Sequence, residues 1–369
     1  MTQGAIIITP EDGIGDELAR LTLKLCSIPS ETGNERAIAD WIQEQCVRLG
    51  GAGSTVRIGN SVICQPAGAE AGPVPVVGLV GHTDTVRCAA DQPLEIRDGR
   101  VYGCGATDMK SGVATMLVLL QRRQELRGAR PVWIFYDREE GPHEENGLEP
   151  VLQSGELPRL DLAFVLEPTD MTVQMGCMGT LHAVVTVAGK RAHSARPWQG
   201  ENALYRAIPL LERLRDRERR EVRLGVLTYY EVIVATQLWT ENSKNVVPDR
   251  AMLNVNVRFA PGKTADDAER ELRELIADDG EVSIIDRAPA GAVYLDHPLV
   301  EPWRRWLGID VACKQAWTDV ARFTERGIPA VNFGPGETAQ AHQAGEWCSV
   351  ESLEYVYGAL RDFFTVPAG

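Results

Sequence analysis

The sequence predicts an α/β domain, built on a mixed sheet flanked by helices, into which a smaller α+β domain is inserted. Two changes of pattern along the 369 residues support this division. The N-terminal half alternates short apolar runs with helical periodicity, which is typical of β-α-β units around a parallel or mixed sheet. The middle of the chain changes to strands of alternating polarity and charged helices, and the β-α rhythm returns after Asp286. We therefore expect one domain from residues 1–176 and 288–369, and a second from residues 177–287.

In the first domain, short apolar runs indicate buried strands, and apolar residues three or four positions apart indicate helices. The pair Gly50-Gly51 also marks the end of a helix. Before the insertion we expect helices over 16–27, 35–49, 109–126 and 146–153, and strands over 54–64, 74–80, 132–136 and 162–166. After it we expect helices over 298–307, 319–326 and 350–364, and strands over 310–314 and 330–333.

In the inserted domain the order strand, helix, strand, strand, helix, strand predicts a ferredoxin-like arrangement with its helices on one face of the sheet. The segment 251–259 alternates polar and apolar residues, as expected for a strand with one polar face. The expected strands cover 181–189, 224–238, 251–259 and 281–285, and the expected helices cover 202–220 and 265–277.

The bulk composition excludes several classes of protein. A formal net charge of -14 argues against a nucleic-acid partner, which would need a basic surface. The segment Met1–Pro10 lacks the basic region and the apolar run of a signal peptide. No stretch approaches the length of a transmembrane helix. We therefore expect a cytoplasmic protein without a membrane partner.

The cysteines are scattered and form no CxxC pair. In a long chain without a signal sequence this pattern argues against a disulfide framework, so we interpret most of them as reduced, small apolar residues. Cys88 and Cys104 flank the candidate site described next, but their spacing does not make them metal ligands.

The motif Gly81–Val86 places a histidine and an aspartate directly after the strand expected over 74–80. An open α/β sheet carries its chemistry outside the carboxyl ends of its strands. If His82 binds a metal ion, Asp84 is well placed to hold the other ring nitrogen and fix the tautomer. Taken alone, the motif is interpreted equally well as a turn with a solvated aspartate.

Further acidic and imidazole side chains follow other expected strands. Asp108 follows a glycine-rich turn and opens the next helix, where an ordinary N-cap is the better explanation of this residue taken alone. Glu139 and Glu140 follow an apolar strand, and adjacent side chains there point in different directions, so one can bind a metal while the other faces a substrate. Glu167 closes another apolar strand, and His342 follows the last one. Taken singly, Glu139 and Glu140 would belong to an ordinary acidic loop, Glu167 would be a solvated acid and His342 a loop histidine.

Together, these strand ends offer two imidazoles and three carboxylates, a set that suits two divalent ions sharing one carboxylate. Mixed nitrogen and oxygen ligation favours zinc, with cobalt or manganese as alternatives. Two ions about 3.5–4 Å apart can polarise a carbonyl and activate a water. A carboxylate outside the ligand set could move the water's proton, and Glu139 is the candidate. The candidate ligands are His82, Asp108, Glu140, Glu167 and His342.

Five motifs that contain these residues resemble, in their sequence order, those of the M20 family of metallopeptidases and deacylases. The resemblance spreads from residue 81 to residue 342, includes the inserted domain and so covers essentially the whole chain. It implies a zinc-exopeptidase-like catalytic domain, an inserted dimerisation or lid domain, two divalent ions and a homodimer. The motifs are Gly-His82-Thr-Asp84-Thr-Val, Gly-Cys-Gly-Ala-Thr-Asp108-Met-Lys-Ser-Gly, Asp137-Arg-Glu139-Glu140-Gly, Glu167-Pro-Thr and the late His342.

Position by position, the resemblance implies a role for each candidate ligand. Asp108 would bridge the two ions. His82 and Glu167 would complete one site, and Glu140 and His342 would complete the other.

The resemblance also implies roles for residues beside the ligands. Glu139 would be the general acid and base, and Asp84 would orient His82. The peptide bond after the bridging aspartate is often cis in the family, so we expect a cis bond between Asp108 and Met109.

In the inserted domain, Arg191–Pro197 resembles the histidine motif of the family. There the histidine, here His193, reaches the active site of the neighbouring subunit and stabilises the oxyanion. Asn245 and Arg258 resemble an asparagine that contacts the substrate and an arginine that binds its carboxylate. Without the resemblance they would be a solvated histidine, a turn asparagine and an edge-strand arginine.

Several segments resemble a bacterial desuccinylase branch of the family, which implies hydrolysis of N-succinyl-LL-2,6-diaminopimelate in lysine and cell-wall precursor synthesis. Other desuccinylases have arginines, which help to hold substrate carboxylates, where this chain has Cys177-Met178. The cations Arg196, Arg258 and Arg322 are therefore candidates to replace them. The segments are Met175–Leu181, Arg191–Arg196 and Trp317–Phe323.

Two alternatives stay open at this point. One is another M20 activity on an N-acyl amino acid or peptide, such as acetylornithine deacetylase, aminoacylase or dipeptidase, because the inserted domain and loops decide the acyl group. The other is a binding protein that kept the fold but lost the chemistry. Such a protein would be expected to lack a ligand or Glu139, and none of these residues is missing.

Overall fold

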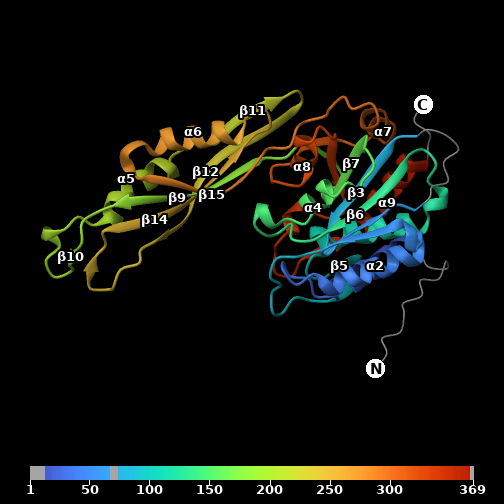
Figure 1. Cartoon of the computed structure of the whole chain (residues 1–369), viewed down its shortest axis with the longest axis horizontal. Coiled ribbons are helices and arrows are strands. Elements are labelled where there is room, and N and C mark those ends of the chain that lie inside the picture. Colours follow the sequence, from blue (N-terminus) through green and yellow to red (C-terminus); the bar gives the residue numbers. More distant parts are fainter. Residues whose placement is uncertain (1–12, 67–73, 366–369) are drawn as a thin grey trace. The chain divides into compact units, whose positions relative to one another are not determined.

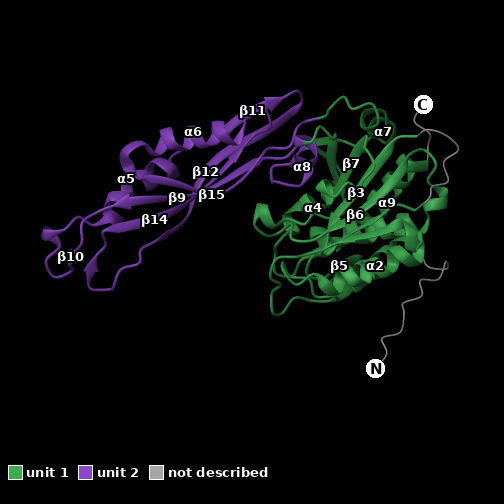
Figure 2. Cartoon of the chain, in the orientation of Figure 1, with its two compact units in different colours: residues 1–175, 294–312, 326–369 green, residues 176–293, 313–325 purple. Residues whose placement is uncertain are grey.

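The computed structural model describes residues 13–66 and 74–365 of the chain (Figure 1). The expectation for Met1–Pro10 lies outside the described residues. The chain divides into two compact units, shown in Figure 2. Unit 1 contains residues 1–175, 294–312 and 326–369, and unit 2 contains residues 176–293 and 313–325. Residues 313–325, which we expected in the first domain, therefore belong to unit 2.

Unit 1 is built on an eight-stranded mixed sheet with the order β1-β2-β6-β3-β7-β17-β8-β16. The four central strands, β6, β3, β7 and β17, run parallel, whereas β2 and β8 are antiparallel to their neighbours. This confirms the predicted mixed sheet. The strands are β1 (Thr55–Ile58), β2 (Ser61–Cys64), β3 (Val76–His82), β6 (Arg130–Tyr136), β7 (Leu162–Pro168), β8 (Val173–Met175), β16 (Val311–Cys313) and β17 (Ala330–Gly334).

Helices cover this sheet, because every residue of β7 and β17 is buried. A strand that buries both of its faces needs helices on each side, which is why these strands read as unbroken apolar runs. On one side, Phe164 of β7 packs edge to face against Trp303 and Phe363. The helices of unit 1 are α1 (Ile14–Cys26), α2 (Arg36–Gly50), α3 (Ser111–Gln121), α4 (Leu148–Gln153), α7 (Val300–Leu307) and α9 (Val350–Thr365).

Two glycines allow α3 to lie close to the central strands. A Cβ atom on Gly112 would lie 2.5 Å from the carbonyl oxygen of Leu166, and one on Gly81 would lie 2.8 Å from the Met109 side chain. Because a larger residue would push the helix away, these glycines set the distance between the start of α3 and the ends of β3 and β7.

A second, three-stranded sheet with the order β18-β5-β4 lies in unit 1. Its strands are only three residues long, too short for a pattern of polarity to predict them. They are β4 (Glu95–Arg97), β5 (Arg100–Tyr102) and β18 (Trp347–Ser349).

Unit 2 contains a five-stranded antiparallel sheet with the order β11-β12-β14-β9-β15. Its helices α5 and α6 share one core with the apolar face of the sheet. Strands β9, β12, β14 and β15 with these helices have the predicted ferredoxin-like order, and β11 adds an edge strand. The elements are β9 (Gly179–Ala188), β10 (Ala192–His193), α5 (Ala203–Arg215), β11 (Arg220–Leu224), β12 (Leu227–Trp239), β13 (Val246–Val247), β14 (Arg250–Phe259), α6 (Ala265–Ile276), β15 (Glu281–Ala288) and α8 (Val320–Glu325).

Two expected helices are shorter in the structure, for local reasons. The helix expected over 109–126 covers only Ser111–Gln121, because Asp108 and Met109 are non-helical before its start and a separate turn over Arg123–Glu125 follows its end. The N-cap interpretation of Asp108 is therefore wrong. The helix expected over 202–220 ends at Arg215, because the residues from Arg220 pair with β12. Among the described residues, no helix is long and apolar enough to cross a membrane.

Candidate metal centre

The five predicted ligands come together in unit 1, and four of them follow parallel strands. His82 is the last residue of β3, Glu140 lies in the loop after β6, Glu167 lies near the end of β7, and His342 lies in the loop after β17. The carboxyl ends of parallel strands meet at one edge of a sheet, so this placement follows from the topology. Asp108 joins them from the turn Ala106–Lys110, which precedes α3.

Asp108 belongs to both groups of potential ligands. Its Oδ1 lies 3.1 Å from Nε2 of His82, and its Oδ2 lies 3.5 Å from Nε2 of His342. Glu167 completes the first group, with Oε1 3.7 Å from the His82 nitrogen. Glu140 completes the second, with Oε1 2.9 Å from the His342 nitrogen. In each group one ligand atom per residue lies within 4.8 Å of the others.

Asp84 supports two parts of this centre at once. Its Oδ1 lies 3.5 Å from Nδ1 of His82, on the side of the ring opposite the ligand nitrogen. Its two carboxylate oxygens also accept the backbone N–H groups of Glu139 (3.0 Å) and Glu140 (3.1 Å). The hydroxyl of Thr32 donates a further hydrogen bond to Oδ2. Asp84 therefore connects the ring of His82, the contact that we predicted, to the loop that carries both glutamates, a contact that we did not predict.

Glu139 lies at the same centre. One of its carboxylate oxygens lies within 4.8 Å of ligand atoms of both His82 and Glu140. Geometry alone would allow it either to bind a cation or to act on a substrate beside one. Its assignment as general acid and base therefore depends on the resemblance.

The carboxylates of this centre raise the pKa of both imidazoles. Burial opposes protonation of His82, but hydrogen bonds to Asp108 and Asp84 raise its pKa well above the ordinary value. Hydrogen bonds to Asp108 and Glu140 raise the pKa of His342 to about 10. Burial disfavours ionisation of Asp108, but both imidazoles lower its pKa. Burial raises the pKa of Glu140.

This donor set fits two divalent cations. Several carboxylates lie close together at a partly buried site, where like charges repel each other. The rings of His82 and His342, which these carboxylates favour in the protonated form, could instead bind metal ions. Imidazole nitrogens with carboxylate oxygens are the ligands that zinc takes in catalytic sites. His82, Asp108 and Glu167 would hold one ion, and Asp108, Glu140 and His342 would hold the other.

The peptide bond between Asp108 and Met109 is cis, as expected from the resemblance. The turn around it contacts a residue that sequence reasoning missed, Glu346, which accepts hydrogen bonds from its backbone. Glu346 lies four residues after His342 in an ordinary polar loop, so no sequence pattern marked it.

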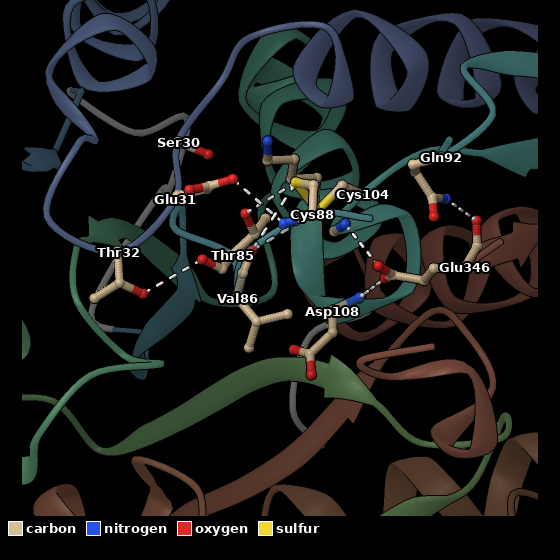
Figure 3. Close-up of a disulfide and its surroundings, with 12 residues drawn as sticks. Ser30, Glu31, Thr32, Thr85, Val86, Cys88, Gln92, Cys104, Asp108 and Glu346 are labelled. Carbon is tan, nitrogen blue, oxygen red and sulfur yellow. Dashed lines mark hydrogen bonds between the residues drawn. A yellow bond between two sulfur atoms is a disulfide. The ribbon is translucent and has the colours of Figure 1, made fainter. Parts of the chain in front are cut away.

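The structure corrects our expectation for two of the cysteines. Cys88 and Cys104 form a disulfide, with their Cα atoms 5.7 Å apart (Figure 3). The bond joins the loop after Asp84 to the loop before Asp108, and closing a loop of this length typically stabilises a fold by about 3 kcal/mol. Their spacing of 16 residues gives no hint of this pairing, because only the fold brings the loops together. The other cysteines are free, as we expected: Cys26, Cys46, Cys64, Cys177, Cys313 and Cys348.

The remaining predicted residues belong to unit 2. His193 on β10 and Asn245 lie beside each other, because β10 pairs with β13 and the N–H of Ser194 donates to the carbonyl of Asn245 (2.9 Å). Arg196 is exposed, in the turn that follows His193. This two-stranded sheet therefore groups three of the predicted site residues.

The other two arginines are held by neighbouring side chains. Arg258 on β14 donates from Nε to the side-chain oxygen of Asn256 (3.1 Å), and burial lowers its pKa. Arg322 is only 3% exposed and forms an ion pair with Asp319 (2.8 Å), so its guanidinium already has an anionic partner.

Cys177-Met178, which stand where other desuccinylases have arginines, lie in the interior of the protein. Both residues are fully buried. The Cys177 thiol donates to the carbonyl of Thr318 (3.3 Å), and the Met178 N–H donates to the carbonyl of Ala316. These two residues therefore pack inside the protein, and the need for other cations to hold substrate carboxylates stays a prediction.

Comparison with known proteins agrees with this geometry. The sequence profile described as peptidase family M20/M25/M40 matches residues 78–365. The chain belongs to this family. It is 35% identical over 364 residues to the succinyl-diaminopimelate desuccinylase of Corynebacterium glutamicum, covering 96% of this chain and 97% of that protein. It is 36% identical over 354 residues to a putative succinyl-diaminopimelate desuccinylase of Mycobacterium tuberculosis (95% and 98%).

Among solved structures, the chain resembles a tripeptidase from Staphylococcus aureus, with a TM-score of 0.76 and 20% identity. The match covers 96% of this chain and 98% of the tripeptidase. At this identity the likeness concerns the fold alone. Membership of the M20 family makes the protein a metal-dependent hydrolase of amide bonds.

We predict that zinc binding to this M20 protein releases about two protons per chain at neutral pH, one from each imidazole, because metal ligands must be deprotonated. Both pKa values are raised in the metal-free protein, so the apparent affinity for zinc should increase as the pH rises. Calorimetric titration in buffers of different ionisation enthalpy measures the number of protons. His342→Ala should remove about one of them. Zinc binding without proton release would contradict the assignment of these two ligands.

Proposed function

We propose that the protein is a dinuclear-metal amide hydrolase that converts N-succinyl-LL-2,6-diaminopimelate and water into succinate and LL-2,6-diaminopimelate. The observation that carries the proposal is the carboxylate of Asp108, which faces two separate groups of ligands at the ends of parallel strands. The near full-length similarity to curated desuccinylases supports the choice of substrate.

Two zinc ions are part of the proposal, with cobalt or manganese as alternatives. When bound, they would polarise the amide carbonyl and make a water a stronger nucleophile. The protein contributes the placement of the ligands. Asp84 holds His82 and the glutamate loop in place.

Glu139 is the proposed carrier of the proton. Hydrolysis breaks the bond between the amide carbon and nitrogen, and the departing amine must gain a proton. Glu139 would take this proton from the attacking water and deliver it to the amine. The hydrogen bond from its backbone N–H to Asp84 fixes its loop beside His82.

His193 is the proposed donor to the oxyanion. The N–H of Ala195 donates to its Nδ1 (3.1 Å), which makes Nδ1 an acceptor. In the neutral ring the proton therefore resides on Nε2, which is free to donate to a developing negative charge. Following the resemblance, we propose that His193 acts on the partner's site in a homodimer formed through unit 2.

The substrate carries several carboxylates, so we propose that cations of unit 2 bind them. Arg196 is exposed beside His193, and Arg258 lies on β14, on the opposite face of the sheet from α5 and α6. Asn245 would contact the substrate from the same two-stranded sheet as His193. Arg322 remains a candidate, but it would have to share its guanidinium with Asp319.

We propose a cytoplasmic location, because the resemblance implies a substrate of lysine and cell-wall precursor synthesis. The Cys88–Cys104 disulfide weighs against this location, since disulfides are rare in reducing compartments.

The choice of substrate predicts the result of a substrate panel. With zinc added, the protein should hydrolyse N-succinyl-LL-2,6-diaminopimelate with a larger kcat/KM than N-acetylornithine, other N-acetyl amino acids or dipeptides. Release of the free amine measures each reaction. Fast cleavage of an acetyl or dipeptide substrate without cleavage of the succinyl substrate would favour the other M20 activities instead.

The role of Glu139 predicts that Glu139→Gln lowers kcat by about 100- to 10,000-fold, because the amide cannot move the proton. Zinc stoichiometry should remain that of the wild type. The matched control is Glu144→Gln, an exposed glutamate in the same loop, which should leave kcat unchanged. Loss of zinc from Glu139→Gln would identify Glu139 as a ligand and contradict its role as the base.

The proposed dimer predicts complementation between two inactive variants. Glu139→Gln and His193→Ala chains, coexpressed with different tags, should form heterodimers in which one of the two sites is intact. Random mixing should restore about a quarter of wild-type activity, after light scattering has established the dimer. A dimer without restored activity would show that His193 serves its own chain or neither.

A further inference from the structure

Glu346 is a buried carboxylate next to the metal centre that is neither a predicted ligand nor the proposed base. It is 4% exposed and lies just before β18. Its Oε2 accepts the backbone N–H of Gly105 (2.7 Å). Its Oε1 accepts those of Thr107 (2.8 Å) and Asp108 (3.0 Å). One side chain therefore satisfies three amides of the turn that carries the shared ligand.

The N–H groups of these amides need a hydrogen-bond acceptor from outside the turn. Asp108 and Met109 have non-helical backbone angles, so the turn before α3 does not form a regular ladder of helical hydrogen bonds. Buried amides without a partner are costly, and a carboxylate that accepts several of them forms strong, charge-assisted bonds. Glu346 thus joins the backbone of Asp108 to the segment before β18.

Glu346 is itself fixed by its neighbours (Figure 3). Its carbonyl accepts the N–H of Gly103 (3.2 Å) and a side-chain N–H of Gln92 (3.1 Å). The side-chain oxygen of Gln92 accepts the N–H of Gly345 (2.8 Å). The loop of Glu346 is therefore held from the two segments that the Cys88–Cys104 disulfide joins.

We propose that Glu346 is a positioning residue that orients Asp108 so that its one carboxylate can serve both metal ions. It does so by joining the backbone of Asp108 to the loop that carries His342. His342 is the predicted ligand that faces Oδ2 of Asp108. This inference rests on the dinuclear site of the proposed function, but not on the choice of substrate.

The placement of Asp108 matters because each of its two carboxylate oxygens must face a different group of ligands. Oδ1 faces His82 and Oδ2 faces His342. Residues that orient a metal ligand typically change metal affinity or activity about 10- to 100-fold when they are replaced. A shift of the turn would weaken both ion sites together, whereas the loss of a residue in one group would weaken one site.

The test compares Glu346→Ala and Glu346→Gln with Glu17→Gln. Glu17 is a matched control, because it is also a buried carboxylate of unit 1 (3% exposed) and forms an ion pair with Arg122 instead of contacting the turn. For each variant, the Kd values for zinc come from calorimetry, the environment of bound cobalt from its visible absorption spectrum, and folding from the thermal midpoint.

We expect Glu346→Ala to weaken zinc binding at both sites by about 10- to 100-fold and to change the cobalt spectrum. It should lower kcat more than it changes KM. Glu346→Gln should lie between wild type and Glu346→Ala, because its amide oxygen can still accept from Thr107 and Asp108 while its NH₂ group faces the N–H of Gly105. Glu17→Gln should change only the thermal midpoint.

Wild-type zinc affinities and cobalt spectrum in a folded Glu346 variant, with only a lower thermal midpoint, would overturn the proposal. If Glu346→Ala does not fold, the Glu346→Gln variant decides the question by the same measurements. A wild type that binds two zinc ions but leaves the succinyl substrate intact would contradict the proposed activity alone, because the zinc affinities of the variants still test Glu346.

Discussion

The centre of unit 1 depends on one carboxylate, that of Asp108, which lies between two imidazoles. His82 faces one of its oxygens and His342 faces the other. Glu140 and Glu167 add further negative charge nearby, and like charges at such distances repel each other unless positive charge lies between them. The carboxylates raise the pKa of both rings and so favour protons there in the metal-free protein, and divalent cations would supply the positive charge in the active one.

Three sets of contacts around this carboxylate hold the neighbouring loops in fixed positions. Asp84 ties the end of β3 to the loop of Glu139 and Glu140. Glu346 ties the turn of Asp108 to the loop of His342. The Cys88–Cys104 disulfide joins the segments on either side of β4 and β5. Such supports matter because a catalytic site works only when its ligands are held within a fraction of an ångström.

Much of the fold was predictable because burial leaves a mark on the sequence. Strand β7 and all of β6 after Arg130 are buried, and their apolar runs revealed them. The expected start of the helix over 109–126 lies too close to Asp108. The alternation of apolar and polar residues there fits a helix, but the backbone of Asp108 and Met109 is non-helical. The short strands of the second sheet left no pattern at all.

The sequence by itself determined which side chains could bind metal, because histidine and acidic residues after apolar runs mark the ends of buried strands. It also indicated an inserted domain, since the pattern of polarity changes where the insertion begins, but it did not place residues 313–325 in unit 2. Only the tertiary structure decided that Cys88 meets Cys104, that Cys177 is buried and that Glu346 holds Asp108. These contacts join loops far apart in the chain, and their distances depend on strand order and packing, which no local pattern encodes.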